Sequence, residues 1–121
     1  MTNREALETA KKLELLTFMP QLDKNCEGLK NSLSIFKQVK KVAKIKEAIA
    51  EFQELAQGSE QKFNEQINSL FNEPFEGEFD SFSIGFFPKE SIEKTTKMPN
   101  GAEITFKEII FALYAKGIIT E

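Results

Sequence analysis

Apolar residues recur every three or four positions along the first part of the chain, which is the spacing of an amphipathic helix. Thr2 and Glu5 stand at the spacing of a capping box, in which a hydroxyl and a carboxylate close the first helical turn. Pro20 ends this helix, because proline lacks a backbone N–H and disfavours a helical residue before it. The pattern therefore predicts a helix over about 3–17.

A second helical pattern follows from Gln21, with positions that alternate four and three residues apart in two runs, from Leu22 to Phe36 and from Ile45 to Leu70. The phase slips between the runs near Val39–Val42, and two positions of the second run are polar. This spacing predicts a seam that packs against another helix, as in a coiled coil. Gly58 weakens such a helix by about 1 kcal/mol relative to alanine but does not force a break. Two interpretations stay open: one helix over about 21–72, or two helices broken near Gly58. The apolar residues of the seam are Leu22, Leu29, Leu33, Phe36, Ile45, Ile49, Phe52, Phe63 and Leu70.

A single helix over 21–72 would be about 75 Å long at roughly 1.5 Å per residue. A helix of this length could not bury its whole seam against one short N-terminal helix. We therefore expect a homo-oligomer, such as a homodimer, in which the seam packs against a second copy or grips a helix of another protein.

The spacing of apolar residues changes after Pro74, where phenylalanines become frequent. Phe82, Ile84 and Phe86 alternate with small residues, and this period of two predicts a strand. The sequence Pro-Asn-Gly at 99–101 is typical of a tight turn between two extended pieces. It predicts a small hairpin, or a loop with one strand.

The last predicted element is a helix. Thr105 and Glu108 repeat the capping-box spacing, and the apolar residues that follow lie on one helical face. Gly117 stands where a helix commonly ends in a left-handed residue. Ile118 and Ile119 can then return to the sheet.

These patterns predict a mainly α protein with N-terminal helices, a long coiled-coil-like helix or helical hairpin, and a small α+β C-terminal part. That part would hold a short sheet and one capped helix. Residues 1–73 form the predicted helical region, and residues 74–121 form the small part packed on it. At 121 residues, we expect both to belong to one domain.

The absent residue types exclude several kinds of chemistry. The chain has no histidine and a single cysteine, Cys26, so histidine-based triads and cysteine- or histidine-rich zinc sites cannot be built within it. The acidic residues between Glu73 and Asp80 do not have the spacing of a calcium loop. We expect no catalytic residue, no cofactor and no metal.

Composition also bears on the compartment and on membranes. The hydrophobic residues make up 40% of the chain, and no apolar run approaches the roughly 20 residues of a membrane span. The polar N-terminal segment does not resemble a signal peptide, and Cys26 has no second cysteine for an internal disulfide. We therefore expect a cytoplasmic protein without a membrane partner.

Lysines form the one concentrated charge in the sequence. Between Gly28 and Lys46 there are six lysines and no acidic residue. Four of them fall within an arc of about 100° on an ideal helix. These four are Lys37, Lys40, Lys41 and Lys44. Such an arc is typical of a solvated helix face, but it would also fit an acidic protein partner or a phosphate backbone.

We expect a non-enzymatic protein–protein interaction module: an adaptor, inhibitor, assembly factor or dedicated chaperone, and thus a small accessory protein. It would act through the helical seam and the lysine face. The alternative is a nucleic-acid accessory protein that uses the same lysines without reading sequence. A protein with only one arginine is poorly equipped for guanine and phosphate recognition, so we favour the protein partner.

Overall fold

The computed structural model describes residues 1–24 and 26–121. The chain is mainly helical, with small C-terminal sheets and a further C-terminal helix, as the sequence predicts. Helix α1 spans Asn3–Leu16, and α5 spans Phe106–Ala115. Both begin at the predicted residues. The Thr2 and Glu5 side chains form the complete capping box, whereas at α5 only the Thr105 half of the predicted box is present, its hydroxyl accepting from the Glu108 N–H. Their termini are therefore set by local sequence.

The prediction of one helix over 21–72 is wrong. Residues 21–24 form turns, and the helical structure begins at Asn31. From there α2 (Asn31–Val39), a 3₁₀ turn η1 (Lys40–Val42) and α3 (Ala43–Ala56) follow without a gap, as a helical stretch of 26 residues. We call this stretch the long helix. The long helix ends well short of residue 72. Residue 25, which belongs to the predicted range, lies outside the described residues.

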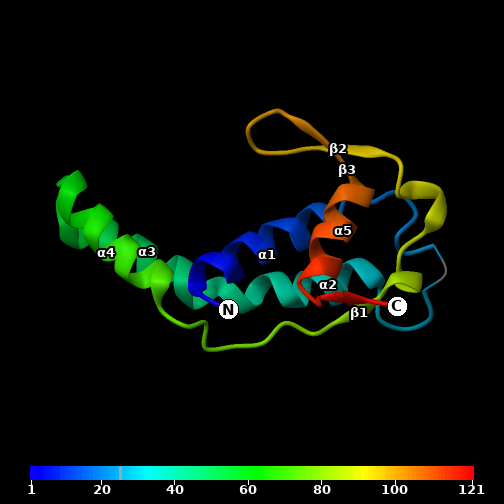
Figure 1. Cartoon of the computed structure of the whole chain (residues 1–121), viewed down its shortest axis with the longest axis horizontal. Helices are drawn as coiled ribbons and strands as arrows, with labels where there is room; N and C mark the ends of the chain where they lie inside the picture. The colour runs from blue at the N-terminus through cyan, green and yellow to red at the C-terminus, as the bar shows by residue number, and fades with distance from the viewer. Residues whose placement is uncertain (25) are drawn as a thin grey trace.

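The helical hairpin is the interpretation that the structure supports. Gln57 and Gly58 both take left-handed backbone conformations, with φ of 50° and 83°, and they reverse the chain. Ser59 then caps α4, which spans Glu60–Asn72, by accepting a hydrogen bond from the Lys62 N–H at 3.4 Å. Figure 1 shows α3 and α4 side by side, as an arm that projects away from the rest of the molecule.

The C-terminal part contains two small two-stranded sheets. Strand β1 (Phe82–Ser83) pairs in parallel with β4 (Ile119–Thr120), with Phe82 opposite Ile119. Strands β2 (Thr95–Lys97) and β3 (Glu103–Thr105) form an antiparallel hairpin across the predicted turn. The predicted strand over 82–86 is shorter than expected, because residues 84–86 form a 3₁₀ turn. The return of Ile119 to the sheet is confirmed.

The main core lies where α1, α2, α5 and the C-terminal sheet meet. Leu13 and Leu16 of α1 pack with Ile35 of α2 and with Phe106 and Leu113 of α5. A second, smaller core lies at the base of the arm. It is made of Ala6, Ala10, Val42 and Ile45, with Ile49, Leu70 and two phenylalanines packed against it. The arm itself buries little: none of residues 60–72 is buried.

Candidate interaction surface

The long helix carries an exposed surface on the side opposite α1. Its inner side holds Ile35, Val39 and Val42, which are buried in the two cores. Its outer side exposes Lys37, Lys40 and Lys44. Three of the four predicted partner-binding lysines therefore lie together in solvent.

Two residues of the predicted seam lie on the same surface. Leu33 and Phe36 are both exposed, Phe36 to 42%, and they stand one helical turn before the lysines. The ammonium of Lys40 lies 4.9 Å from the centre of the Phe36 ring, within the range of a cation–π contact. We call the surface made of Leu33, Phe36, Lys37, Lys40 and Lys44 the basic face.

Beside the basic face there is a shallow, largely open hollow. Leu33 and Phe36 line it from α2, and Thr17, Lys30 and Ser32 complete it. An apolar side chain of a partner could occupy this hollow while its acidic groups reach the lysines. The surface therefore combines apolar anchorage with positive charge.

The fourth predicted lysine, Lys41, also makes contacts within the chain. The Lys41 ammonium donates to the Glu78 carbonyl at 2.6 Å and lies 3.6 Å from a carboxylate oxygen of Asp80. The side-chain amide of Gln38, which is buried, both donates to Asp80 and accepts from its backbone N–H, each at 2.9 Å. These bonds hold the segment before β1 against the long helix. Lys41 thus has structural contacts within the chain.

The remaining seam residues do not form one continuous stripe. Leu22 is buried in the main core, whereas Leu29 is exposed. Ile45, Ile49 and Leu70 belong to the core at the base of the arm. Phe52 and Phe63 are half-buried between α3 and α4. The spacing of four and three fails before Asn31 because that part of the chain is not helical.

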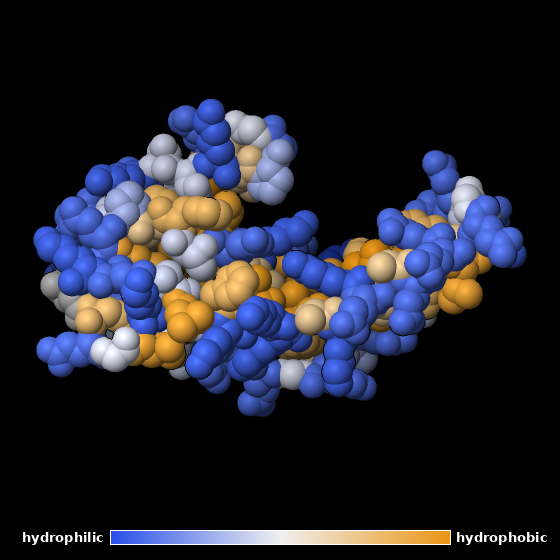
Figure 2. Space-filling model, turned by 180° about the vertical axis from the view of Figure 1, so that it is seen from behind, coloured by the Kyte–Doolittle hydropathy of each residue, from blue (hydrophilic) through white to orange (hydrophobic). Residues whose placement is uncertain are grey.

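The arm displays apolar surface that sequence reasoning missed. Leu55 is 67% exposed, and Ile67 on α4 is half-buried. Figure 2 shows apolar atoms between the polar side chains of the arm. The position of Ile67 follows from the spacing Phe63–Ile67–Leu70 once α4 is counted from its own cap at Ser59. That cap was the signal that could have identified it.

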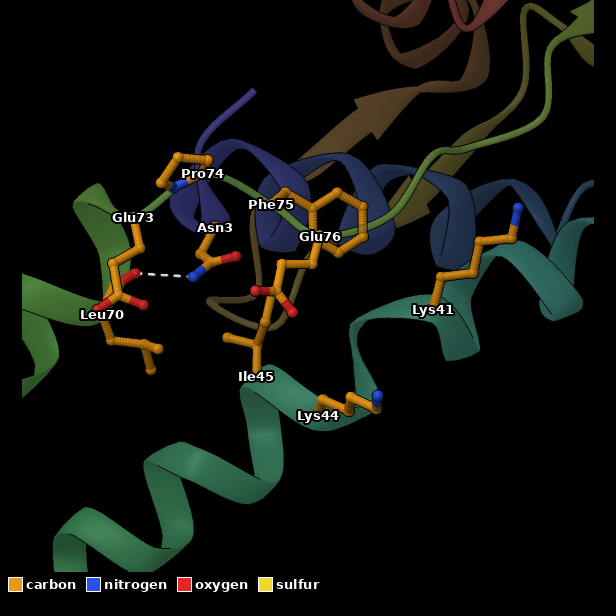
Figure 3. A pocket seen from close by; sticks show the side chains of 9 residues that line it. All are labelled: Asn3, Lys41, Lys44, Ile45, Leu70, Glu73, Pro74, Phe75 and Glu76. Atoms are coloured by element: carbon orange, nitrogen blue, oxygen red, sulfur yellow. Dashed lines mark hydrogen bonds between the residues drawn. The ribbon is translucent and has the colours of Figure 1, made fainter.

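A pocket of about 210 Å³ lies at the base of the arm (Figure 3). Lys41 and Lys44 line it from the long helix, and Glu73 and Glu76 line it from the segment after α4. The Asn3 side chain reaches into the same region and donates to the Leu70 carbonyl at 2.8 Å. Two lysines and two glutamates line the pocket, so it offers mixed charge and no concentration of one sign.

A wider cleft of about 460 Å³ lies under the β2–β3 hairpin. Leu15, Phe18 and Met98 give it an apolar floor, and lysines and glutamates stand around it. Within the described residues, every buried side-chain nitrogen and oxygen has a hydrogen-bond partner. The residues that line the cleft can therefore offer a ligand apolar contacts and ion pairs. Among the described residues, no buried polar side-chain atom is left without a partner for a ligand to bind.

Two carboxylates have lowered pKa values for structural reasons. Hydrogen bonds from the Thr2 backbone and hydroxyl lower the pKa of Glu5. Hydrogen bonds from the Ser32 hydroxyl and N–H, at 2.6 and 2.8 Å, lower the pKa of Asp23. Glu5 belongs to the capping box of α1, and Asp23 accepts from the N–H of Ser32 in the first turn of α2. Both carboxylates thus stabilise the start of a helix.

Cys26 is half-buried, with its Sγ 3.1 Å from both the backbone N and the side-chain Oδ1 of Asn31. Across residues 1–24 and 26–121, no three His, Cys, Asp or Glu side chains are grouped as metal ligands would be. Over the same part of the chain, no helix is long and apolar enough to cross a membrane. No protein-family model, curated protein or solved structure matches the chain.

Proposed function

We propose that the protein is a non-enzymatic interaction module that binds an acidic amphipathic helix of another protein chain through the basic face. The observation that carries this proposal is the position of Leu33 and Phe36 in solvent beside Lys37 and Lys40. Aromatic residues such as phenylalanine are enriched at the cores of protein interfaces, and the rim around such a core is polar.

The chemistry of the partner follows from the basic face itself. Lysines steer a partner of opposite charge and fix its orientation, whereas buried apolar contacts supply most of the affinity. A helix with glutamates on one side and leucines beside them would satisfy both sets of residues. An adaptor, inhibitor, assembly factor or dedicated chaperone could work in this way.

Binding of a phosphate backbone has less support. Lys41 already contacts Asp80, and Glu47 and Glu51 follow the lysines along the same helix. A nucleic acid lying along the long helix would meet these glutamates within two turns, and like charges repel. The lysine stripe is therefore too short to follow more than a few phosphates.

The test uses a labelled synthetic helix built from leucine and glutamate, with binding followed by fluorescence anisotropy. We expect wild-type protein to bind it, and Leu33→Asp and Lys40→Glu each to weaken binding at least about tenfold. Lys62→Glu, on the exposed side of α4, is the matched control and should bind like wild type. Circular dichroism checks that each variant is folded.

Two results would overturn the proposal. One is peptide binding that Leu33→Asp and Lys40→Glu leave unchanged. The other is no peptide binding together with oligonucleotide binding that Lys40→Glu abolishes and salt weakens steeply, as expected for phosphate contacts.

A further inference from the structure

The charges of the long helix are divided into two blocks. Between Asn31 and Lys46 there are five lysines and no acidic residue, and between Glu47 and Ala56 there are three glutamates and no basic residue. The lysines lie in the half near the cores, and the glutamates lie in the half that belongs to the arm. A single helix thus has a basic half and an acidic half.

Both blocks face the same way. On an ideal α-helix at roughly 100° per residue, Lys37, Lys40, Lys44 and the three glutamates would fall within an arc of about 100°. The 3₁₀ turn η1, which winds more tightly, lies between the two blocks and turns them relative to each other by a few tens of degrees. All six side chains are exposed. The opposite side of the long helix is covered, by α1 in its first half and by α4 in its second. The two blocks therefore form one outward surface.

The two blocks are also symmetric about a point between Ile45 and Lys46. For each of the three lysines Lys37, Lys40 and Lys44, one glutamate lies the same number of residues on the other side of this point. The matched positions are Lys37 with Glu54, Lys40 with Glu51, and Lys44 with Glu47. The exposed apolar residues Phe36 and Leu55 obey the same relation.

We propose that the partner of the basic face is a second copy of this chain, paired antiparallel along the long helix about a two-fold axis that crosses between Ile45 and Lys46. Each lysine of one copy then lies opposite its matched glutamate of the other, and Phe36 packs against Leu55 at both ends. This inference rests on the proposed function and supplies its acidic helix. A two-fold axis requires such a self-complementary surface.

Two of the three matched pairs cannot neutralise each other within one chain, whereas Lys44 and Glu47, three residues apart, are neighbours on the helix. Along one helix, Lys37 and Glu54 are about 25 Å apart and Lys40 and Glu51 about 16 Å apart. Both separations exceed the screening length of about 8 Å at physiological salt. In the described part of the chain, the ion pairs involve Lys41, Lys107 and Lys116, and none of the six matched residues.

The helix dipole adds a further reason for pairing. Glu54 lies in the last turn of α3, where the partial negative charge of the helix end disfavours a carboxylate. In the antiparallel pair, Lys37 of the second copy would lie against this end and offset both negative charges. The arrangement that is unfavourable in one copy becomes favourable in two.

The experiment uses two triple variants of the full chain. K37E/K40E/K44E has glutamate at all six positions, and E47K/E51K/E54K has lysine at all six. We expect wild type to be a dimer at low salt by light scattering after size exclusion, and to dissociate as salt rises. Each triple variant alone should be a monomer. An equal mixture of the two should form a heterodimer, because every matched pair is then lysine with glutamate.

A cysteine variant tests the orientation in a nearly native chain, should a triple variant not fold. In a Cys26→Ser background, K40C/E51C should form a disulfide-linked dimer, whereas K40C alone should not. A parallel pair would instead cross-link K40C to itself. The matched control reverses the charges of Glu60, Lys62 and Glu65 on α4. This variant should still form the dimer.

The outcomes separate this inference from the proposed function. A wild-type monomer at low salt that still binds the synthetic acidic helix would overturn the antiparallel dimer and leave the interaction module standing. A dimer that persists in high salt and in both triple variants would also overturn it. Loss of peptide binding in Leu33→Asp belongs to the proposed function alone.

Discussion

The side-chain amide of Asn3 donates a hydrogen bond to the backbone carbonyl of Leu70, 67 residues away, at 2.8 Å. Asn3 is only 6% exposed, although it is polar and lies at the start of α1. Its backbone N–H donates to the Glu73 carbonyl, and the Phe75 N–H donates to the Met1 carbonyl, each at 2.9 Å. These bonds fasten the end of α4, and hence the arm, to the N-terminal helix.

Asn3→Ala should destabilise the protein and loosen the arm. The substitution removes one hydrogen bond to the Leu70 carbonyl, which keeps the Glu73 N–H as a donor at 3.2 Å. The loss is therefore that of one hydrogen bond, about 0.5–1.5 kcal/mol of unfolding free energy. Chemical denaturation measures this loss, and hydrogen exchange should rise most in α4. Asn68→Ala, at an exposed position of α4, should change stability by less than about 0.5 kcal/mol. Equal losses for the two variants would contradict this role of Asn3.

Asp23 should make stability depend on acid pH. Because its pKa is lowered below 3.8 in the folded protein, its stabilising contribution is complete well above this value and is lost as the pH falls through the folded pKa. Asp23→Asn should therefore lower the unfolding free energy at neutral pH, because a neutral amide accepts the two hydrogen bonds from Ser32 more weakly than a carboxylate does.

The check on Asp23 is urea denaturation at a series of pH values. The difference between wild type and Asp23→Asn should shrink as the pH drops below about 4. Ser32→Ala removes one of the two donors to the carboxylate and should show part of the same pH dependence. A difference that is constant with pH would mean that the charge of Asp23 is irrelevant to folding.

The two residues of the turn between α3 and α4 should respond in opposite ways to substitution. Adding a glycine at position 57 should stabilise the protein, and removing the glycine at position 58 should destabilise it. Gln57 has φ of 50°, a conformation that costs a side-chain-bearing residue about 1 kcal/mol and that glycine adopts freely. Gln57→Gly should therefore raise the melting temperature slightly. Gly58→Ala should lower it, although no atom lies within 4 Å of the added Cβ, because φ is 83°. Thermal denaturation of both variants tests these two predictions. A higher melting temperature for Gly58→Ala would exclude a left-handed conformation at residue 58.

Two phenylalanines of α5 should differ sharply when truncated. Phe106 is 1% exposed in the main core, whereas Phe111 is 58% exposed. Phe106→Ala should cost about 3–5 kcal/mol, through lost burial and the cavity that remains. Phe111→Ala should cost less than about 1 kcal/mol. Denaturant unfolding of the two variants tests which face of α5 packs on α1. Similar losses of unfolding free energy would mean that α5 packs through a different face.

The ends of helices followed from the sequence where local chemistry sets them. The caps at Thr2 and Thr105 act within one turn, so their residue types are sufficient. The start of α2 could not be found in this way, because its N-cap residue Lys30 makes no side-chain cap and the first-turn N–H of Ser32 bonds to Asp23, nine residues earlier. The break at Gly58 was left open, since a glycine alone does not show which way the chain turns.

The basic face was predicted in two pieces. The sequence predicted the lysines as one group and the apolar seam as another. Each group contributes residues to the basic face. What the spacing could not show is that Lys41 turns to Asp80, because that contact joins positions 39 residues apart. Nor could it show that Leu33 and Phe36 stay uncovered, which depends on where α1 packs. Whether this surface binds a partner stays a prediction.

The bonds between the N-terminal residues and the end of α4 have a consequence for the order of folding. The arm needs only local contacts across Gln57 and Gly58, and such hairpins form early because little loop entropy is lost. The contacts of Met1 and Asn3 with residues 70–75 close a loop of nearly the whole helical region. We therefore expect a formed but unattached arm in the early folding chain, and its attachment to be among the late steps.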